Sequence, residues 1–337
     1  MKKRLFTIFS ILFIDIFALS IVYPIFTALL LQSNNLLISD SQSWRNFYLV
    51  FLIGAFPAAQ LIGAPLIGYF ADRTSRKLAF FLALTGECFG LFFSGWAIHV
   101  HSYPLLVLSR LITGFFAGNL TVCLAAISDI SPNQKVRSTN FGNVASVTAI
   151  SFFAAGLTGG IFVKLQASLP FYIAALLCLI NMGCVKWWFH PLQVVHIKSK
   201  KPLSRDVKQL YFCFLLFILA YIPFLQFLRT FSTEKFNTSS STITLSYLSI
   251  GLVWTLSSLF MNRLLLTRFS IAGILRLSLL FFGFTLFIFQ LAYNELTAMI
   301  VAPLIALFAA LIWTNALTLL STLGPQNKQG ELLGINQ

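Results

Sequence analysis

Residues 47–77 read FYLVFLIGAFPAAQLIGAPLIGYFADRTSRK, an uncharged apolar run that ends in a short, highly charged segment. An α-helix needs about 20 apolar residues to cross the hydrocarbon core of a bilayer. The uncharged part, 47–71, is long enough to do so. It also lacks the alternation of apolar and polar residues, in segments of about ten, that is typical of a transmembrane β-barrel. This stretch therefore predicts a membrane-spanning helix.

Runs of this kind recur along the chain, and the composition agrees with them. The 337 residues are 58% hydrophobic and 9% charged, whereas a soluble domain carries roughly 25% charged residues. A surface so poor in charge is poorly solvated by water, so we expect lipid around it. We predict an all-α membrane protein with ten transmembrane helices, over residues 5–31, 47–71, 78–98, 104–127, 141–163, 170–189, 209–232, 242–265, 269–292 and 297–322.

One long polar segment, HPLQVVHIKSKKPLSRDVK at 190–208, interrupts the series of runs. It is basic and contains two prolines, as expected of a connection between two bundles. We therefore predict a six-helix bundle over 1–189, a cytoplasmic linker over 190–208 and a four-helix bundle over 209–337.

The formal net charge of +14 suggests nucleic acid as a partner only if the basic residues share a soluble face. Here they lie in short loops between apolar runs, so we expect no nucleic acid. With the N-terminus in the cytoplasm, most Lys and Arg residues fall on that side, including six from Lys186 to Lys208, as the positive-inside rule requires. The first run lacks a small-x-small cleavage site. We predict an uncleaved first helix, cytoplasmic termini and a bacterial inner membrane.

The motifs indicate neither a cofactor nor a metal. The five cysteines lie in apolar runs and form no CxxC pair, so neither a disulfide framework nor a zinc site is indicated. The sequence contains no HExxH, GxSxG or P-loop motif. We therefore expect no enzyme activity.

Two pairs of loops resemble each other at nearly one offset. Arg73 falls on Arg268 when the chain is shifted by 195 residues, and Pro132 falls on Pro325 when it is shifted by 193. Both pairs follow equivalent spans on the cytoplasmic side, which indicates an internal duplication. We therefore expect a six-plus-six parent, of which this chain lacks the last two helices.

Three ionisable residues lie inside predicted spans, where burial of charge is costly and marks a functional candidate. They are Asp15, Glu87 and Arg110. A carboxyl group in a low-dielectric cavity can bind and release a proton near neutral pH, as proton coupling requires. Alternatively, Arg110 pairs with a carboxylate and only holds the bundle together.

Small and neutral polar residues also mark the spans. Arg110, Gly114 and Gly118 recur at every fourth position, on one helix face where small residues let two backbones approach. Four amide side chains could line a cavity or could form hydrogen bonds between helices, and the sequence leaves both open. They are Gln60, Asn119, Gln226 and Asn315.

The loop from Gly68 to Lys77, GYFADRTSRK, is the most specific pattern in the chain. The positive-inside rule accounts for its cations, Arg73, Arg76 and Lys77, but not for Gly68 or Asp72. The loop resembles the cytoplasmic signature loop of the major facilitator superfamily.

Two further patterns carry the same resemblance. Arg110, Gly114 and Gly118 resemble the fourth-helix motif of that superfamily, and Asp129 and Arg137 resemble the pattern that closes that helix. The first span resembles that of the drug–proton antiporter branch, which includes tetracycline exporters. The resemblance extends from the first span to residue 337.

The resemblance implies a major facilitator-type fold and a secondary transporter that works by alternating access. It implies that Asp72, Arg76 and Asp129 form a cytoplasmic charge network that latches the outward-facing state. It also implies that Asp15 and Arg110 take part in proton or substrate coupling.

Two departures from the family pattern bear on these expectations. Antiporters carry a fifth-helix motif that ends Gly-Pro-x-x-Gly-Gly, whereas this chain has Ala155, Gly156, Gly159 and Gly160 at the equivalent places. The packing glycines are present, but the absent Pro weakens the case for export. In the family, the signature-loop Asp also faces the positive end of the eleventh helix. We expect no such helix here, so that Asp72 lacks this partner.

Three functions remain open. The leading one is proton-coupled export of a small drug-like compound by a monomer, with the bilayer, protons and that compound as its partners. Uptake of a nutrient such as a sugar, an organic acid or a siderophore is slightly favoured by the absent Pro. The third is a non-transporting remnant, which the ten-span count suggests.

Overall fold

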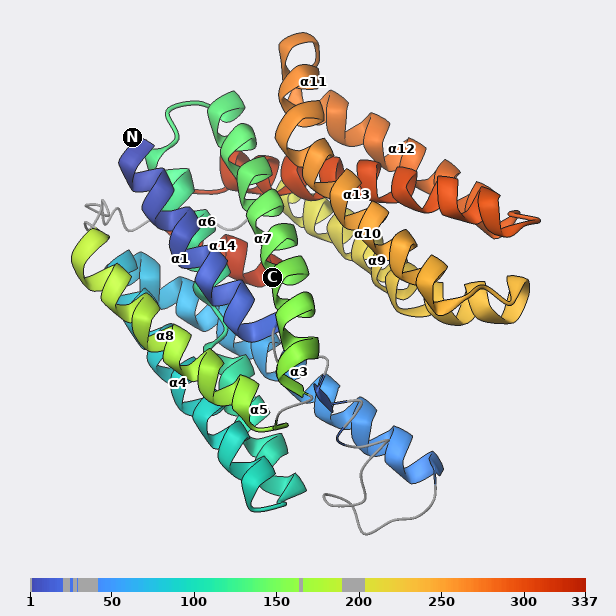
Figure 1. Ribbon diagram of the computed structural model, residues 1–337. Coiled ribbons are helices and arrows are strands. Elements are labelled where there is room, and N and C mark those ends of the chain that lie inside the picture. The colour runs from blue at the N-terminus through green and yellow to red at the C-terminus, as the bar shows by residue number, and fades with distance from the viewer. Residues whose placement is uncertain (1, 21–24, 27–28, 30–41, 164–165, 190–203) are drawn as a thin grey trace. The chain divides into compact units, whose positions relative to one another are not determined.

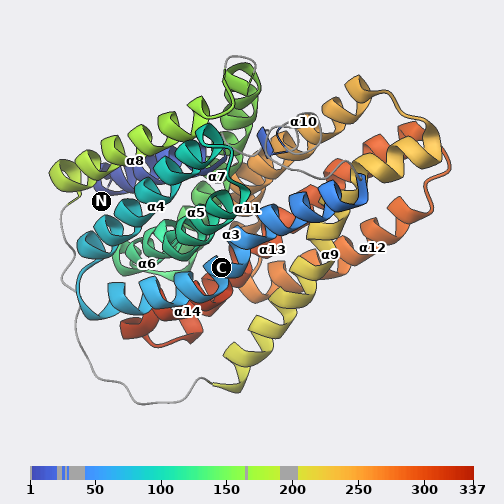
Figure 2. The same cartoon turned by 90° about the horizontal axis from the view of Figure 1, so that it is seen from below.

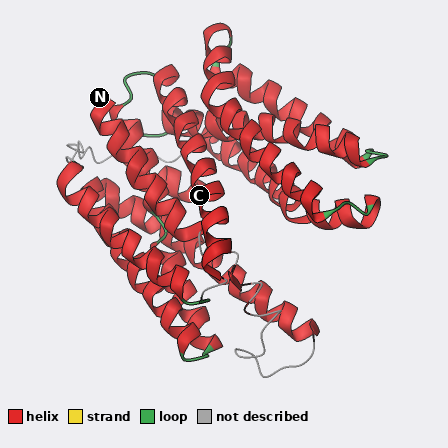
Figure 3. Cartoon of the chain, viewed as in Figure 1, coloured by secondary structure: helices red, strands yellow, loops and turns green. Residues whose placement is uncertain are grey.

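The computed structural model describes residues 2–20, 25–26, 29, 42–163, 166–189 and 204–337, which fold into helices joined by loops (Figure 3). No strand occurs among these residues. Nine helices in the described segments are long and apolar enough to cross a membrane. A further helix, α1, covers the described beginning of the first predicted run. The prediction of an all-α, multi-pass membrane protein is confirmed.

Each of the ten predicted runs corresponds to one helix or to consecutive helical segments. In chain order the elements are α1 (Lys2–Ser20), α3 (Gln42–Arg73), α4 (Arg76–His99), α5 (Tyr103–Phe116), α6 (Asn119–Ile130), α7 (Gln134–Val163), α8 (Leu169–Trp188), α9 (Arg205–Phe236), α10 (Ser240–Leu256), η2 (Ser257–Met261), α11 (Asn262–Arg268), α12 (Ile271–Gln290), α13 (Glu295–Leu323), η3 (Gln326–Lys328) and α14 (Gln329–Asn336).

Three features differ from a simple series of spans. The predicted run over 104–127 is divided between α5 and α6, and the run over 242–265 contains the π-helical turn η2. A short helix, α14, follows the last predicted run. A run of apolar residues shows that a segment crosses lipid, but it does not show where the helix inside that segment is interrupted.

Side-chain caps explain where several helices begin. The Oγ atom of Ser75 accepts a hydrogen bond from the N–H of Leu78 at the start of α4. Ser270 caps α12 in the same way, and the Oδ1 atom of Asn294 caps α13. Each cap satisfies one of the backbone N–H groups that have no partner within the helix.

The chain forms two compact units. Unit 1 comprises Met1–Ile130, Ser151–Ser199 and Asn327–Gln337, and unit 2 comprises Ser131–Ile150 and Lys200–Gln326. Helix α7 therefore contributes to both units. The predicted division at 190–208 stays a prediction, because residues 190–203 lie outside the described part of the chain.

Within unit 1, α4 lies between α5 and α8, and α14 packs against α3 (Figures 1 and 2). Within unit 2, α13 packs against α9, α10 and α12. Many large apolar side chains of both units are exposed, among them Leu61, Phe227 and Leu280. Because acyl chains solvate such side chains and water does not, these helices suit a bilayer. Several polar side chains are buried instead, among them Asp15, Arg76 and Asn315.

Candidate functional site

The fourth span is interrupted near its middle, and the interruption positions a polar side chain. Helix α5 ends at Phe116 and α6 begins at Asn119, with Ala117 and Gly118 between them. The carbonyl oxygen of Ala117 accepts a hydrogen bond from Gln60 Nε2 at 2.9 Å. A carbonyl group released from a helix at membrane depth needs such a donor. The break therefore has a partner within the fold, and it places Asn119 at the first position of α6.

A buried cluster of three polar side chains lies beside this break. The Nδ2 atom of Asn119 donates to Asp15 Oδ1 at 2.7 Å and to Glu87 Oε2 at 2.9 Å. The exposed fractions are 2% for Asp15, 0% for Glu87 and 1% for Asn119. One amide nitrogen therefore bridges the two carboxyl groups. The structure thus brings together two predicted coupling residues and one predicted cavity residue, from α1, α4 and α6.

The amide bridge between the two carboxyl groups has a chemical consequence. Two carboxylates offer only acceptors, and the side chain of Asn119 is a neutral donor that cannot cancel two negative charges. If both were charged, they would repel each other in the same buried site. The Asp15–Glu87 pair is therefore an arrangement that can bind a proton, and can release it when the pair opens.

Neighbouring helices hold α1 at this cluster. On α8, the fully buried Asn181 donates from Nδ2 to the backbone oxygen of Ile11 at 2.9 Å. Two of these helices also carry free thiols, Cys123 on α6 and Cys178 on α8. Both are small buried side chains.

Arg110 occupies a different environment in the same unit. Its side chain is 1% exposed, and its guanidinium carbon lies 5.3 Å from the ring centroid of Phe26 and 4.8 Å from that of Phe56. A cation over an aromatic face is attracted by the quadrupole of the ring. The structure therefore places Arg110 against aromatic rings, whereas Asp15 and Glu87 accept hydrogen bonds from Asn119.

The predicted packing glycines differ in their surroundings. An added Cβ on Gly114 would overlap the backbone carbonyl of Phe56, and one on Gly118 would lie 2.7 Å from the side chain of Ile67. Both positions are therefore close helix contacts, although Gly118 lies in the break and does not continue the helix that carries Arg110.

The fifth-helix glycines give less support to the packing prediction. A Cβ on Gly156 would meet no atom of the described residues within 4 Å, so those residues give it no close helix contact. The surroundings of Gly159 and Gly160 lie outside the part of the chain whose side chains are described.

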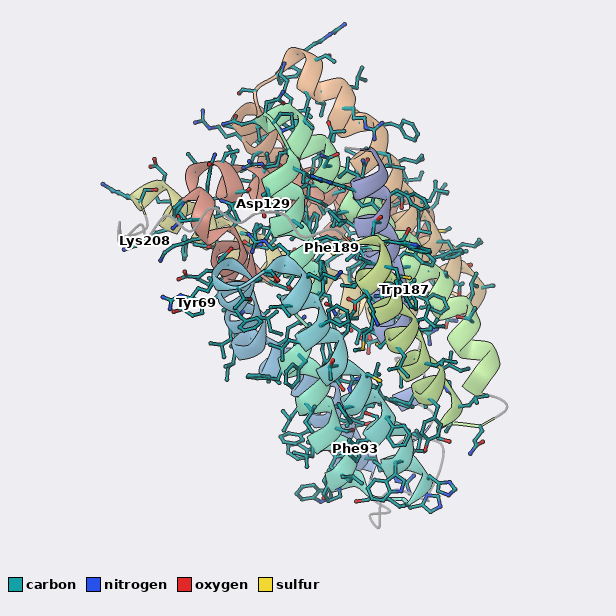
Figure 4. The ribbon with its side chains drawn as sticks, turned by 90° about the vertical axis from the view of Figure 1, so that its left-hand side faces the viewer. Tyr69, Phe93, Asp129, Trp187, Phe189 and Lys208 are labelled. Carbon is teal, nitrogen blue, oxygen red and sulfur yellow. The ribbon has the colours of Figure 1, made fainter. Side chains whose placement is uncertain are left out.

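A second polar cluster lies where α3 ends and α4 begins. Arg76 is 1% exposed and donates from Nη1 to Asp72 Oδ1 at 2.7 Å and from Nε to Asp129 Oδ2 at 3.0 Å. Asp129 and Phe189 lie toward one end of unit 1, and Phe93 lies toward the other (Figure 4). The three residues of the implied charge network are thus in contact at one end of the unit.

Asp72 also contacts the start of α14. Its Oδ1 atom accepts from the N–H of Gly330 at 2.9 Å, and its Oδ2 atom accepts from the N–H of Glu331 at 2.8 Å. The expectation that Asp72 lacks a helix N-terminus as its partner is therefore wrong, because the eight residues of α14 supply one. The closeness depends on two glycines, since a Cβ on Gly68 would overlap the backbone of Gly330 and the reverse is also true.

The other cations of the signature loop lie outside this cluster. Arg73 is exposed and lies over the ring of Tyr69, 4.3 Å from its centroid. The Nζ atom of Lys77 donates to the backbone oxygen of Lys186 at 2.7 Å, near the end of α8. That carbonyl belongs to the negative end of α8, so the contact is electrostatically favourable.

A third set of polar contacts joins helices within unit 2. Asn315 Nδ2 donates to Asn262 Oδ1 at 2.9 Å, and Ser138 Oγ donates to Asn315 Oδ1 at 3.1 Å. Arg137 Nη1 donates to the backbone oxygen of Ser321 at 3.0 Å and lies 2.9 Å from its Oγ. For Asn315, the structure therefore gives a hydrogen bond between helices.

Of the other amide side chains, two were singled out from the sequence and two were not. Gln60 bonds to the helix break, and Gln226 is exposed on α9. Sequence reasoning missed Asn181 and Asn262, which are fully buried and bond to other helices. The same signal that singled out Asn119, an amide inside an apolar run, was present at both.

Curated proteins with similar sequences include two named for drug resistance. The tetracycline resistance protein, class H, of Pasteurella multocida is 26% identical over 176 residues, which is 52% of this chain and 42% of that protein. The quinolone resistance protein NorA of Staphylococcus aureus is 28% identical over 178 residues, again 52% of this chain and 42% of that protein. The match thus spans less than half the length of either relative.

Solved structures show the same fold. The crystal structure of the human organic anion transporter MFSD10 has a TM-score of 0.83 at 16% identity, covering 99% of this chain and 89% of that one. The fucose:proton symporter FucP of E. coli has a TM-score of 0.79 at 14% identity, covering 98% and 87%. The family model described as Major Facilitator Superfamily matches residues 8–337. This chain belongs to the Major Facilitator Superfamily.

Proposed function

We propose that the chain is a secondary active transporter that couples export of a small drug-like compound to the entry of protons. The observation that supports this proposal best is the buried cluster of Asp15, Glu87 and Asn119, in which one amide nitrogen bridges two carboxyl groups. Such a pair can take up a proton on one side of the membrane and release it on the other when the surrounding helices move. The relatives named for tetracycline and quinolone resistance favour a drug-like compound.

The cluster of Asp72, Arg76 and Asp129 is the cytoplasmic latch in this proposal. Its charge-assisted hydrogen bonds join α3, α4 and α6, and those from Asp72 reach the N-terminus of α14. Opening this end of unit 1 has to break them, so the latch favours the outward-facing state. In this proposal both termini lie in the cytoplasm, which the distribution of Lys and Arg supports, and the bacterial relatives support a bacterial inner membrane.

Inverted membrane vesicles test the coupling. Tetracycline and a quinolone, the first probes of a larger panel, are added to vesicles with an imposed proton gradient, and proton movement is followed with a pH-sensitive dye. We expect Asp15→Asn to abolish proton movement driven by the compound. Asp206→Asn is the matched control, since Asp206 is an exposed carboxylate at the start of α9. Proton movement in Asp15→Asn equal to that of the unchanged chain would remove Asp15 from the mechanism.

Nutrient uptake is the second candidate, and the absence of the fifth-helix Pro favours it. The residues at this place are Ala155 and Gly156 where the antiporter motif has Gly-Pro. The direction of transport separates the two candidates. An exporter accumulates its compound in inverted vesicles, whereas a proton-driven importer accumulates it in right-side-out vesicles.

A further inference from the structure

The hydrogen bonds of the buried cluster can be assigned atom by atom. An amide side chain has two N–H donors, and Asn119 uses both, one on Asp15 Oδ1 and one on Glu87 Oε2. The other oxygen of Glu87, Oε1, is buried and has no hydrogen-bond partner among the described residues. Two carboxylates on one amide nitrogen would repel each other, and one proton on the pair relieves that repulsion.

Asn119 supplies the pair with two neutral donors. On α5, the guanidinium group of Arg110 lies against the rings of Phe26 and Phe56. Negative charge on the pair is stabilised by the two N–H groups of Asn119, with the positive end of α6 adding to them.

The position of Asn119 is set by the backbone and not by the carboxyl groups themselves. The side chain projects from the first residue of α6, directly after the break at Ala117 and Gly118. Gln60 holds the carbonyl oxygen of Ala117, and Gly118 fits closely beside Ile67. Contacts of the backbone and of Gln60 thus present the amide to the pair.

We propose that Asn119 is a positioning residue that holds the Asp15–Glu87 pair at one shared proton. Its two N–H groups stabilise one negative charge on the pair and so oppose binding of a second proton. Release of the shared proton leaves two carboxylates on one amide nitrogen, which repel each other and favour separation of α1 from α4. The pair takes up a proton again when the helices close. This inference rests on the proposed function, since the shared proton is the coupling proton.

Infrared difference spectroscopy on the purified full chain in detergent tests the proton count. The carbonyl band of a protonated carboxyl group is distinct from the bands of a carboxylate, and the whole chain has only nine acidic residues. We expect one protonated carboxyl group that is lost in Glu87→Gln. In Asn119→Leu, which removes both donors, we expect a second protonated group at a pH at which the unchanged pair holds one. Asn119→Ser keeps one donor, so its number of protonated carboxyl groups should lie between those of the unchanged chain and of Asn119→Leu.

Asn181→Leu is the matched control. Asn181 is an equally buried amide that contacts α1, but it donates to the backbone of Ile11 and not to a carboxylate. Its replacement should leave the proton count at one. An unchanged count in a folded Asn119→Leu and in Asn119→Ser, or the same gain in Asn181→Leu, would overturn the inference.

The infrared proton count tests the inference, and the transport assay tests the proposed function, so either claim can be contradicted without the other. Compound-driven proton movement by a chain whose pair holds two protons would overturn the inference alone. One shared proton in a chain that moves no proton with any compound would overturn the proposed function alone.

Discussion

Arg76 holds two carboxylates with two different nitrogen atoms. Its Nη1 atom bonds to Asp72 and its Nε atom bonds to Asp129, while the whole side chain is 1% exposed. The planar guanidinium group presents its donors in a fixed fork, which a lysine ammonium group cannot reproduce. Removing this cation would leave the buried carboxylate of Asp72 without its charge partner, and a buried charge without a partner is costly.

Replacement of Arg76 by Ala should therefore lower stability strongly. We expect a loss of about 3–5 kcal/mol in the free energy of unfolding, the range for breaking a buried ion pair. Arg73→Ala is the control, because Arg73 is exposed and only lies over the ring of Tyr69; its loss should stay below about 1 kcal/mol. Unfolding of the purified variants in detergent, followed by circular dichroism, measures both. Equal losses of unfolding free energy in Arg76→Ala and Arg73→Ala would contradict a stabilising role for the ion pairs of Arg76.

At the scale of elements, the close approach of α3 and α14 depends on residues without side chains. The backbones of Gly68 and Gly330 contact each other, and this closeness lets Asp72 reach the N–H groups of Gly330 and Glu331. The carboxylate thus caps the N-terminus of α14, where negative charge is favourable. Packing of small residues, rather than a hydrophobic driving force, is what brings helices together within lipid.

A methyl group at Gly68 should separate these two helices. We expect Gly68→Ala to raise hydrogen–deuterium exchange of the backbone amides in residues 329–336, because the added Cβ displaces α14 and its bonds to Asp72. Gly54→Ala is the matched control on the same helix, since a Cβ there meets nothing within 4 Å. Mass spectrometry of the exchanged peptides provides the measurement. Protection of α14 in Gly68→Ala at the level of Gly54→Ala would contradict this account of the contact.

At the scale of the whole molecule, the helical spans could be predicted because lipid imposes length and hydropathy on every one of them. The sequence also singled out Asp15 and Glu87. Burial of a carboxyl group within an apolar span is energetically unfavourable, so such a residue is a functional candidate. Their partnership could not be predicted, because Asn119 lies 104 positions from Asp15 and reaches it only through the fold.

Other features escaped prediction for local reasons. The break at Ala117 and Gly118 lies within an apolar run. Hydropathy identifies such a run but does not show where its helix is interrupted. Helix α14 is short and contains two glycines, so its pattern predicts a loop, yet its contacts with α3 stabilise it. The resemblance correctly associated Asp72, Arg76 and Asp129, which composition alone did not connect.

The central claim is that the Asp15–Glu87 pair couples proton movement to transport, and Glu87→Gln in proteoliposomes tests it most directly. The glutamine side chain of this variant resembles a permanently protonated carboxyl group, because it is neutral and offers a donor to Asp15. With a compound that the vesicle assay identifies as transported, we predict that this variant still exchanges labelled for unlabelled compound but no longer accumulates it against a gradient. Accumulation at the level of the unchanged chain would contradict the account.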